Sequence, residues 1–377
     1  MKLFRILSAC TILGFQTVSF AQGLPILGAK GQGLSALEVK VVADSQAGLH
    51  EPADLAINPL HPEQIYVTNH SRNSVAVLEL NAEGAVAKAS LASGMGSDHF
   101  MPRPSGIAFA SNGFFATIHD IATKTQDSTP ADFMGPTLWT QEWFEGGHGS
   151  HMDMLHNSPS GLGIAWIHGN AYVVNDGAHG SLTVYDFRRD HNYGGADHSD
   201  GIALRYADGQ LLRVKGVPSG VVFDQSTGVA YAVDTGHRRL VSVDLGLKLA
   251  TTNNFDYILM ANSTYKVERE VEPNYDGGLQ AYVDGAALAT VVDGQSMGME
   301  QPSGLALRDG VLYVADHAQP QILAFDLKGQ LLDRLLLSDV LPEAAGAALG
   351  GLEFDAEGRL YVTDMKNDKL YRLELKR

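Results

Sequence analysis

The chain has 377 residues, of which 45% are hydrophobic and 19% charged, and its formal net charge is −16. An excess of negative charge this large argues against nucleic acid or an anionic membrane surface as a partner. The single cysteine, Cys10, lies close to the N-terminus, so the rest of the chain can form no disulfide, thiolate nucleophile or thiolate metal site.

The first predicted element is a secretory signal peptide, residues 1–21. Lys2 and Arg5 precede a mostly apolar run, and residues 19–21 (SFA) place small side chains at the positions that a signal peptidase reads. The run is too short to span a membrane, and no later run is long enough for membrane insertion. Residues 7–10 (LSAC) resemble a lipobox, but they come too early to follow a usable apolar region. We therefore expect a secreted or periplasmic protein, with a net charge of −18 once Lys2 and Arg5 are removed.

A repeat organises the rest of the chain. Each copy has a corner with Pro or Gly, a short apolar run, a turn, and an aliphatic and aromatic run that ends near Asp, Asn or His. Short runs of β-branched and aromatic residues between Gly, Asp and Asn turns indicate strands rather than helices. The six copies are residues 52–70, 104–120, 161–177, 218–236, 302–317 and 350–365.

The spacing of the repeats predicts the fold class. Blades starting near 52, 104, 161, 218, 302 and 350 are mostly about 50 residues apart, which is typical of three- to four-stranded propeller blades. We expect residues 22–377 to form one all-β domain, a six-bladed β-propeller, with insertions at 121–158 and 250–300. Residues 265–273 (YKVEREVEP) alternate like a strand and would form an enlarged blade edge or a flap.

Closure of the ring is assigned to the strand predicted at residues 37–43 (LEVKVVA). The last repeat ends with only three strands, so this N-terminal strand is expected to complete it as the outer fourth strand and cover its edge. The alternative, an isolated N-terminal strand, leaves that edge exposed.

Residues 302–327 (PSGLALRDGVLYVADHAQPQILAFDL) resemble the repeats of NHL proteins, and the resemblance extends over residues 37–377. It implies a six-bladed β-propeller. NHL propellers include enzymes, protein-binding modules and sensors, so the resemblance leaves the function open.

Five histidines are the candidate metal ligands. His99 and His156 occupy the same position before the first strand of their repeats, in HFMPRPSGIAF and HNSPSGLGIAW, whereas His70, His119 and His317 follow the second strand of theirs. These positions lie on one face of a propeller, because successive strands run antiparallel. Imidazoles that converge near the axis would hold a divalent metal, most readily zinc or copper. Alternatively, these histidines are turn residues, since such positions favour Asn, Asp and His.

His151 and Asp153 are the candidate catalytic groups. With His148 they lie near the end of the 121–158 insertion, just before His156, where they would act as acid–base groups or orient a ligand. A solvated polar loop is the alternative, because loops are the usual location of such residues.

A second candidate metal site is the glycine-rich stretch at residues 188–201. Its Asp190, Asn192, Asp197 and Asp200 would suit calcium, although the spacing is not that of an EF-hand. No G-x-S-x-G, H-E-x-x-H or P-loop motif occurs, so serine-triad, zincin and nucleotide chemistry are unsupported, and no organic cofactor is expected.

Two function hypotheses remain. The first is a metal-dependent lyase or hydrolase with its site near the axis; here the chain is distantly similar to peptidyl-hydroxyglycine amidating lyases, a resemblance that implies zinc held by histidines. The second is a non-enzymatic propeller that binds a peptide, glycan or small ligand. Both predict a monomer with a small-molecule or peptide partner.

Overall fold

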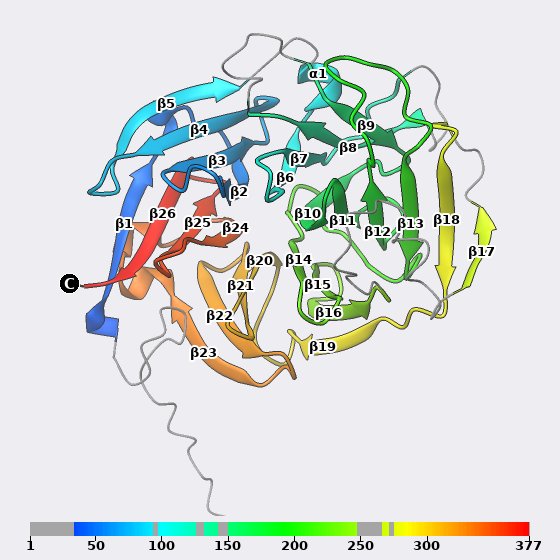
Figure 1. The fold of residues 1–377 in the computed structure, drawn as a ribbon. Helices are drawn as coiled ribbons and strands as arrows, with labels where there is room; N and C mark the ends of the chain where they lie inside the picture. Colours follow the sequence, from blue (N-terminus) through cyan, green and yellow to red (C-terminus); the bar gives the residue numbers. More distant parts are fainter. Residues whose placement is uncertain are drawn as a thin grey trace, which may run out of the picture.

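The computed structural model describes residues 34–92, 97–125, 132–141, 150–246, 266–270 and 275–376. In these ranges six β-sheets form a ring around a central axis, so the predicted six-bladed β-propeller is confirmed (Figure 1). The predicted signal peptide and His148 lie outside the described residues. None of the described helices has the length and apolar character needed to cross a bilayer.

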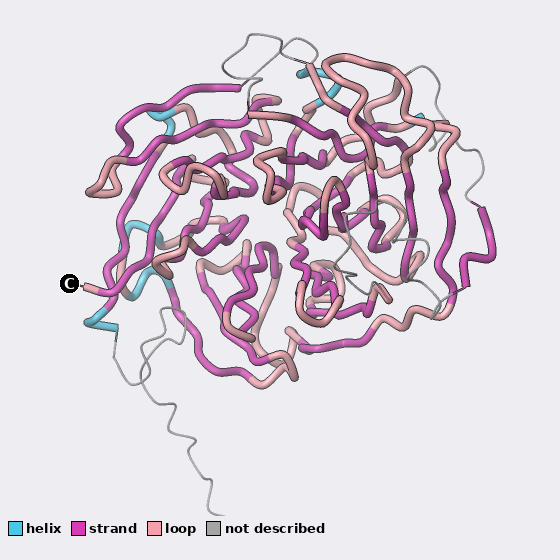
Figure 2. Tube along the Cα trace, in the orientation of Figure 1, coloured by secondary structure: helices cyan, strands magenta, loops and turns pink. Residues whose placement is uncertain are grey.

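Within the described ranges, helix is confined to short pieces (Figure 2). They are α1 (Ser97–Phe100) and the 3-10 turns Leu34–Ala36, Ser45–Ala47, Leu337–Asp339 and Pro342–Ala344.

The first two blades are four-stranded and follow the chain from the axis outward, because each apolar run pairs with the next across a short turn. Blade 1 consists of β2 (Pro52–Ile57), β3 (Gln64–Asn69), β4 (Ser74–Leu80) and β5 (Val86–Ala92). Blade 2 consists of β6 (Pro104–Phe109), β7 (Phe115–His119), β8 (Met134–Trp139) and β9 (Asp153–His156). Two of these strands, β8 and β9, therefore lie within the 121–158 segment.

Blade 3 has six strands. It consists of β10 (Gly161–His168), β11 (Ala171–Asp176), β12 (Ser181–Asp186), β13 (Ile202–Tyr206), β18 (Leu279–Asp284) and β17 (Lys266–Glu270), in that order from the axis. β18 pairs parallel with β13, and β17 pairs antiparallel with β18 at the outer edge. Of the two alternatives for residues 265–273, the described part matches the enlarged blade edge. Residues 247–265 and 271–274 lie outside the described ranges.

Blades 4 and 5 return to four strands. Blade 4 consists of β14 (Val221–Asp224), β15 (Val229–Asp234), β16 (Arg239–Asp244) and β19 (Ala289–Asp293). Blade 5 consists of β20 (Pro302–Arg308), β21 (Val311–Asp316), β22 (Gln321–Asp326) and β23 (Leu331–Leu336).

The N-terminal strand closes the ring, as predicted. Blade 6 consists of β24 (Leu349–Phe354), β25 (Leu360–Asp364), β26 (Lys369–Leu375) and β1 (Leu37–Ala43). β1 pairs antiparallel with β26 and joins Leu37 to Leu375, and Lys40 Nζ lies 2.8 Å from Glu374 Oε1 beside this pairing. The edge of the last blade is thus covered by the other end of the chain.

The inner strands approach each other closely around the axis, and glycine makes this approach possible. Five blades have a glycine at the same position of the inner strand. In each of them the next residue is apolar and pairs with a residue of the second strand. A Cβ on any of these glycines would lie within about 3 Å of a neighbouring inner strand, for example 2.4 Å from Ser219 O at Gly163 and 2.0 Å from Gly350 O at Gly304. The five are Gly106, Gly163, Gly220, Gly304 and Gly351.

We call the side of the ring on which the inner strands begin the start face, and the opposite side the end face. Because β3, β7 and β21 run antiparallel to the inner strands, they end at the start face. His119 is the last residue of β7, and His70 and His317 follow the ends of β3 and β21, so these three lie at the start face.

A methyl group at the axis is expected to destabilise the propeller. Gly304→Ala should cost about 1–3 kcal/mol, or more, because backbone rather than a flexible side chain receives the added Cβ. Gly209→Ala is the control: its φ is +70° and nothing lies within 4 Å of an added Cβ, so only the backbone strain of about 1–2 kcal/mol applies. Urea denaturation measures both. A Gly304→Ala variant no less stable than Gly209→Ala would contradict close packing at the axis.

Candidate metal centre

Three histidines come together near the outer strands of blades 2 and 3. His151, His191 and His198 each offer one ring nitrogen, and these three atoms lie within 4.8 Å of one another. In the described part of the chain, no other group of three or more His, Asp or Glu side chains is close enough to share an ion. The group precedes β9 and lies in the connection from β12 to β13, away from the inner strands. This location differs from the expected one near the axis.

Backbone hydrogen bonds hold the β12–β13 connection against the start of β9. His191 N donates to Met152 O at 3.1 Å, and Gly194 N donates to His151 O at 3.0 Å. Gly195 is required here, since a Cβ at this position would lie 2.5 Å from His191 Nδ1.

The strand pairings show on which face the β12–β13 connection lies. Asp186, at the end of β12, pairs with Ala171, which pairs with His168 at the end of β10. The connection therefore leaves blade 3 at the end face.

Hydrogen bonds to the outer ring nitrogens set the tautomers of two of the histidines. His198 Nδ1 lies 2.9 Å from Asp153 Oδ1, and His191 Nδ1 lies 2.7 Å from the backbone carbonyl oxygen of Asn192. Each acceptor requires a proton on Nδ1, which leaves the lone pair on Nε2. A carboxylate or a carbonyl behind the ring is the usual support of a metal-bound histidine.

His151 is the most enclosed member of the group. Its ring stacks on Phe100 with centroids 4.0 Å apart, and its Nδ1 lies 3.4 Å from Ser150 Oγ. Burial, together with the nearby imidazoles of His191 and His198, lowers the pKa of His151 to about 3. A ring that stays neutral keeps a lone pair available for a metal.

The inner nitrogens lack partners. His151 Nε2 and His191 Nε2 are buried and make no hydrogen bond with the described residues. Asp153 is 1% exposed, and burial raises the pKa of its carboxyl group despite the hydrogen bond to His198. Asp153 Oδ1 also lies 3.8 Å from His191 Nε2, so a carboxylate borders the three nitrogens. The donor set is three imidazoles with an adjacent carboxylate, which suits zinc or copper.

His156 is close to this group but has other partners. It ends β9, is fully buried, and its Nδ1 lies 2.5 Å from Asp276 Oδ1. Its Nε2 lies 2.7 Å from Thr125 Oγ1. Both ring nitrogens are therefore used by protein groups. His156 and His198 have ring centroids 6.1 Å apart.

His99 and His119 extend the histidine-rich region towards the start face. His99 lies in α1 beside Phe100, and burial, together with the nearby imidazole of His156, lowers the pKa of His99. His119 is 1% exposed, with its Nε2 3.0 Å from Thr117 Oγ1, and burial lowers its pKa to about 3. The structure does not bring either residue into a group of three ligands with the other predicted histidines.

His70 and His317 lie nearer the axis and contact other groups. His70 lies 3.3 Å from Arg103 Nη2 and 3.8 Å from Asp120 Oδ2 through its Nε2. His317 Nδ1 lies 3.1 Å from the carbonyl oxygen of Leu349, to which it donates. As metal ligands, His70, His99, His119, His156 and His317 stay predictions.

The carboxylates of the 188–201 stretch accept hydrogen bonds from nearby backbone amides. Asp190 Oδ1 accepts from Asn192 N at 3.2 Å, and Asp197 Oδ1 from Ser199 N at 3.1 Å. Asp200 Oδ2 accepts from Arg189 N at 3.3 Å. Such bonds are typical of Asx turns, and calcium at these residues stays a prediction.

Sequence reasoning singled out His151 and Asp153 but missed His191 and His198, although both lie in the stretch considered for calcium. The signal available was the pair of histidines in DHNYGGADHSD at 190–200. Their distance in sequence from His151 gave no reason to combine them.

No protein-family model matches the sequence, and no curated protein does. The fold is similar to an auxiliary nutrient binding protein from Bacteroides ovatus, with TM-score 0.55 and 11% identity, covering 93% of this chain and 79% of that one. It is also similar to a luciferin-regenerating enzyme, with TM-score 0.52 and 12% identity, covering 90% of this chain and 95% of that one. A streptogramin B lyase matches with TM-score 0.52 and 10% identity, covering 92% of this chain and 100% of that one. At these identities the similarity establishes the propeller fold and leaves the chemistry to the site.

Removing the His156 imidazole is expected to destabilise the protein strongly. In His156→Ala the Asp276 carboxylate, 1% exposed, loses its cationic or donor partner, which typically costs about 3–5 kcal/mol. The control His237→Ala breaks the pair with Asp234, in which the histidine is 47% exposed, and should cost less than about 1 kcal/mol. Urea midpoints compare the two. Equal losses would rule out a structural role for the His156–Asp276 pair.

Proposed function

We propose that this chain is a metal-dependent β-propeller in which His151, His191 and His198 hold a divalent transition metal, zinc or copper. The observation that carries the proposal is the convergence of three imidazoles within 4.8 Å, two of them with a buried and unpartnered Nε2. A buried polar atom without a hydrogen bond costs free energy, and a metal bonded to both nitrogens removes that cost.

The donor set also indicates the reaction class. Three nitrogen ligands leave zinc a fourth position for water or a substrate oxygen, and the ion would polarise that oxygen or lower the pKa of the water. This chemistry supports a lyase or a hydrolase. His151 would then be a ligand rather than an acid or base, and Asp153 would orient His198 and accept a proton.

The setting that we propose for this activity is an exported, monomeric NHL-type propeller that acts on a small molecule or a peptide. The leader-like residues 1–21 support export, and the repeat pattern supports the NHL type. A streptogramin B lyase and an auxiliary nutrient binding protein share the fold, so the fold is compatible with both catalysis and ligand binding.

Metal content tests the proposal. Protein purified without a polyhistidine tag and dialysed against Zn²⁺ or Cu²⁺ is expected to bind one equivalent, measured by inductively coupled plasma mass spectrometry. His191→Ala and His198→Ala should each lose it, because two ligands hold the ion too weakly to survive dialysis. Asp153→Asn should weaken binding about 10–100-fold, since it removes the carboxylate behind His198.

The matched control is His237→Ala, which removes an exposed histidine that pairs with a carboxylate elsewhere in the ring. It should keep the metal. Circular dichroism checks that each variant is folded. Absence of bound metal in the wild-type protein, or full binding by both folded His191→Ala and His198→Ala, would refute the proposal.

A further inference from the structure

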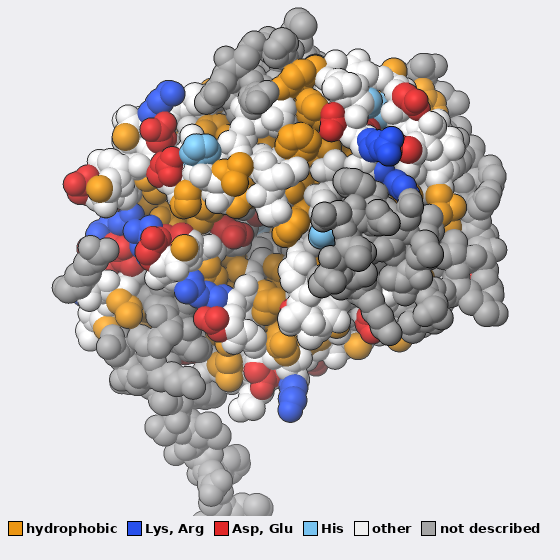
Figure 3. Space-filling view, viewed as in Figure 1, with side chains coloured by type: hydrophobic (Ala, Val, Ile, Leu, Met, Phe, Trp, Pro, Cys, Tyr) orange, Lys and Arg blue, Asp and Glu red, His pale blue; other side chains and the backbone are white. Residues whose placement is uncertain are grey.

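A cavity of about 720 Å³ opens along the axis at the end face, separate from the three-histidine group. Its wall contains the ends of all six inner strands, from β2 to β24, and the face shown in Figure 3 is hollowed at its centre. Cavities that bind small organic molecules typically measure about 300–1,000 Å³. The size is therefore that of a small-molecule site.

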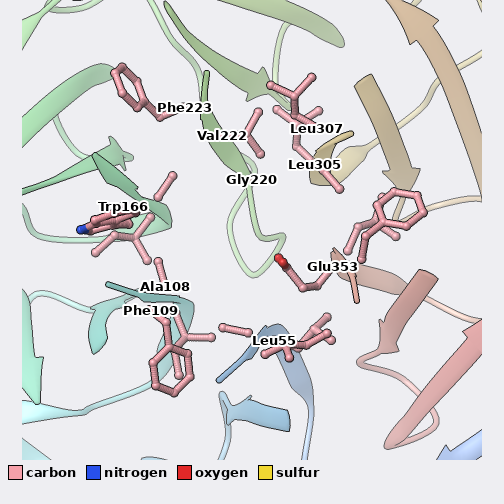
Figure 4. Close-up of a pocket in the computed structure, with 18 of the residues that line it drawn as sticks. Leu55, Ala108, Phe109, Trp166, Gly220, Val222, Phe223, Leu305, Leu307 and Glu353 are labelled. Carbon is pink, nitrogen blue, oxygen red and sulfur yellow. The ribbon is translucent and has the colours of Figure 1, made fainter. Parts of the chain in front are cut away.

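The wall of this axial cavity has apolar side chains from several blades beside its polar groups. Phe109, Trp166, Val222, Leu307 and Phe354 come from five different blades, line the cavity and are all partly exposed. Figure 4 shows the first four of them around the cavity. Partly exposed aromatic and aliphatic side chains arranged around one hollow favour an apolar ligand body.

Two acidic residues interrupt the repeat pattern at the cavity. At the position of the five axial glycines, blade 1 has Asp54. Two residues further along the inner strand, blade 6 has Glu353, and the other blades have only small or aliphatic residues. Those residues are Ala56, Ala108, Ala165, Val222 and Ala306. Both exceptions line the cavity and lie in adjacent blades, with Asp54 Oδ1 next to Gly351.

The two carboxyl groups differ in how they are held. Asp54 Oδ2 accepts a hydrogen bond from Ile107 N at 3.0 Å, which ties blade 1 to blade 2. The Glu353 carboxylate accepts no hydrogen bond from the described residues, and Figure 4 shows it projecting towards the centre of the cavity. Burial raises the pKa of Asp54 to about 7; burial and the charge of Asp54 raise that of Glu353 to about 8.

We propose that the axial cavity binds a small organic ammonium ion, with its –NH₃⁺ group at Asp54 and Glu353 and its apolar body against the aromatic and aliphatic wall. An ammonium group has three donors and no acceptor, which matches a pair of carboxylates of which one, Glu353, accepts no hydrogen bond from the described residues. A calcium or magnesium ion would require six or more oxygen ligands, and the other two carboxylates of the wall, Asp355 and Asp309, are paired with Arg359 and Arg308.

Isothermal titration calorimetry with 2-phenylethylamine at pH 8.5, above the raised pKa of both carboxyl groups, tests the proposal. The neutral analogue 2-phenylethanol and the anion 3-phenylpropanoate have a similar apolar body and differ in charge. The wild-type protein is expected to bind the amine at least about tenfold more tightly than the alcohol, because a charge-assisted hydrogen bond contributes more than a neutral one, and to bind the anion least. Equal affinities for amine and alcohol, or binding of Ca²⁺ in place of the amine, would overturn the proposal.

Glu353→Gln separates charge from shape. It should weaken amine binding about tenfold or more and leave 2-phenylethanol binding unchanged. Glu357→Gln, which alters a carboxylate paired with Arg359 outside the cavity lining, is the matched control and should change neither affinity. An amine affinity that is the same in wild type and Glu353→Gln would contradict the assignment.

Thermal melting at several pH values shows whether Glu353→Gln is folded. It also tests whether folding raises the pKa of the Glu353 carboxyl group. A carboxyl whose pKa is raised by folding loses its proton at higher pH in the folded than in the unfolded protein, so stability falls as the pH rises from about 4 to about 8. Glu353→Gln should lose part of this decline and melt above the wild type at pH 8.5. The other charged groups at the cavity, Arg308, Asp309 and Asp355, are unchanged in this comparison. A lower melting temperature of the variant at pH 8.5 would contradict a raised pKa at Glu353.

Discussion

The structure depends on the close approach of six inner strands around one axis. At five of the six equivalent positions only the absence of a Cβ allows neighbouring backbones to meet, and Asp54 fills the sixth and bonds to Ile107 N. Beyond this packing, a cavity lies at the end face. The packing of the inner strands also sets the positions of the outer strands, because each blade extends outward from its inner strand by regular antiparallel pairing.

The two sites arise from departures from the repeat. At the axis, Asp54 and Glu353 replace small residues and place two carboxyl groups beside the apolar side chains of the cavity wall. At the rim, the β12–β13 connection is long enough to fold back over β9 and bring His191 and His198 to His151. The regular blades provide a rigid frame, and function is proposed where the chain deviates from it.

The fold could be predicted from the sequence because its signal recurs six times. The PSG corners, the second strands such as YVAD, and the unpaired strand at 37–43 indicated both the blades and the closure of the ring. The histidine group could not be predicted in the same way. Backbone hydrogen bonds join the residues just before β9, His151 and Met152, to a loop of another blade, and repeat spacing does not encode such a contact. For His156, the repeat gave the position but not the partner, Asp276, which lies 120 residues away.

The most direct test of the account is to locate the metal. Crystals soaked in Zn²⁺ or Cu²⁺ give an anomalous difference map at the absorption edge of the metal. We expect a single strong peak bonded to His151, His191 and His198, with ligand distances of about 2.0–2.1 Å for zinc. A peak at His99 and His156, a peak at the axis, or no peak at the three histidines would contradict it.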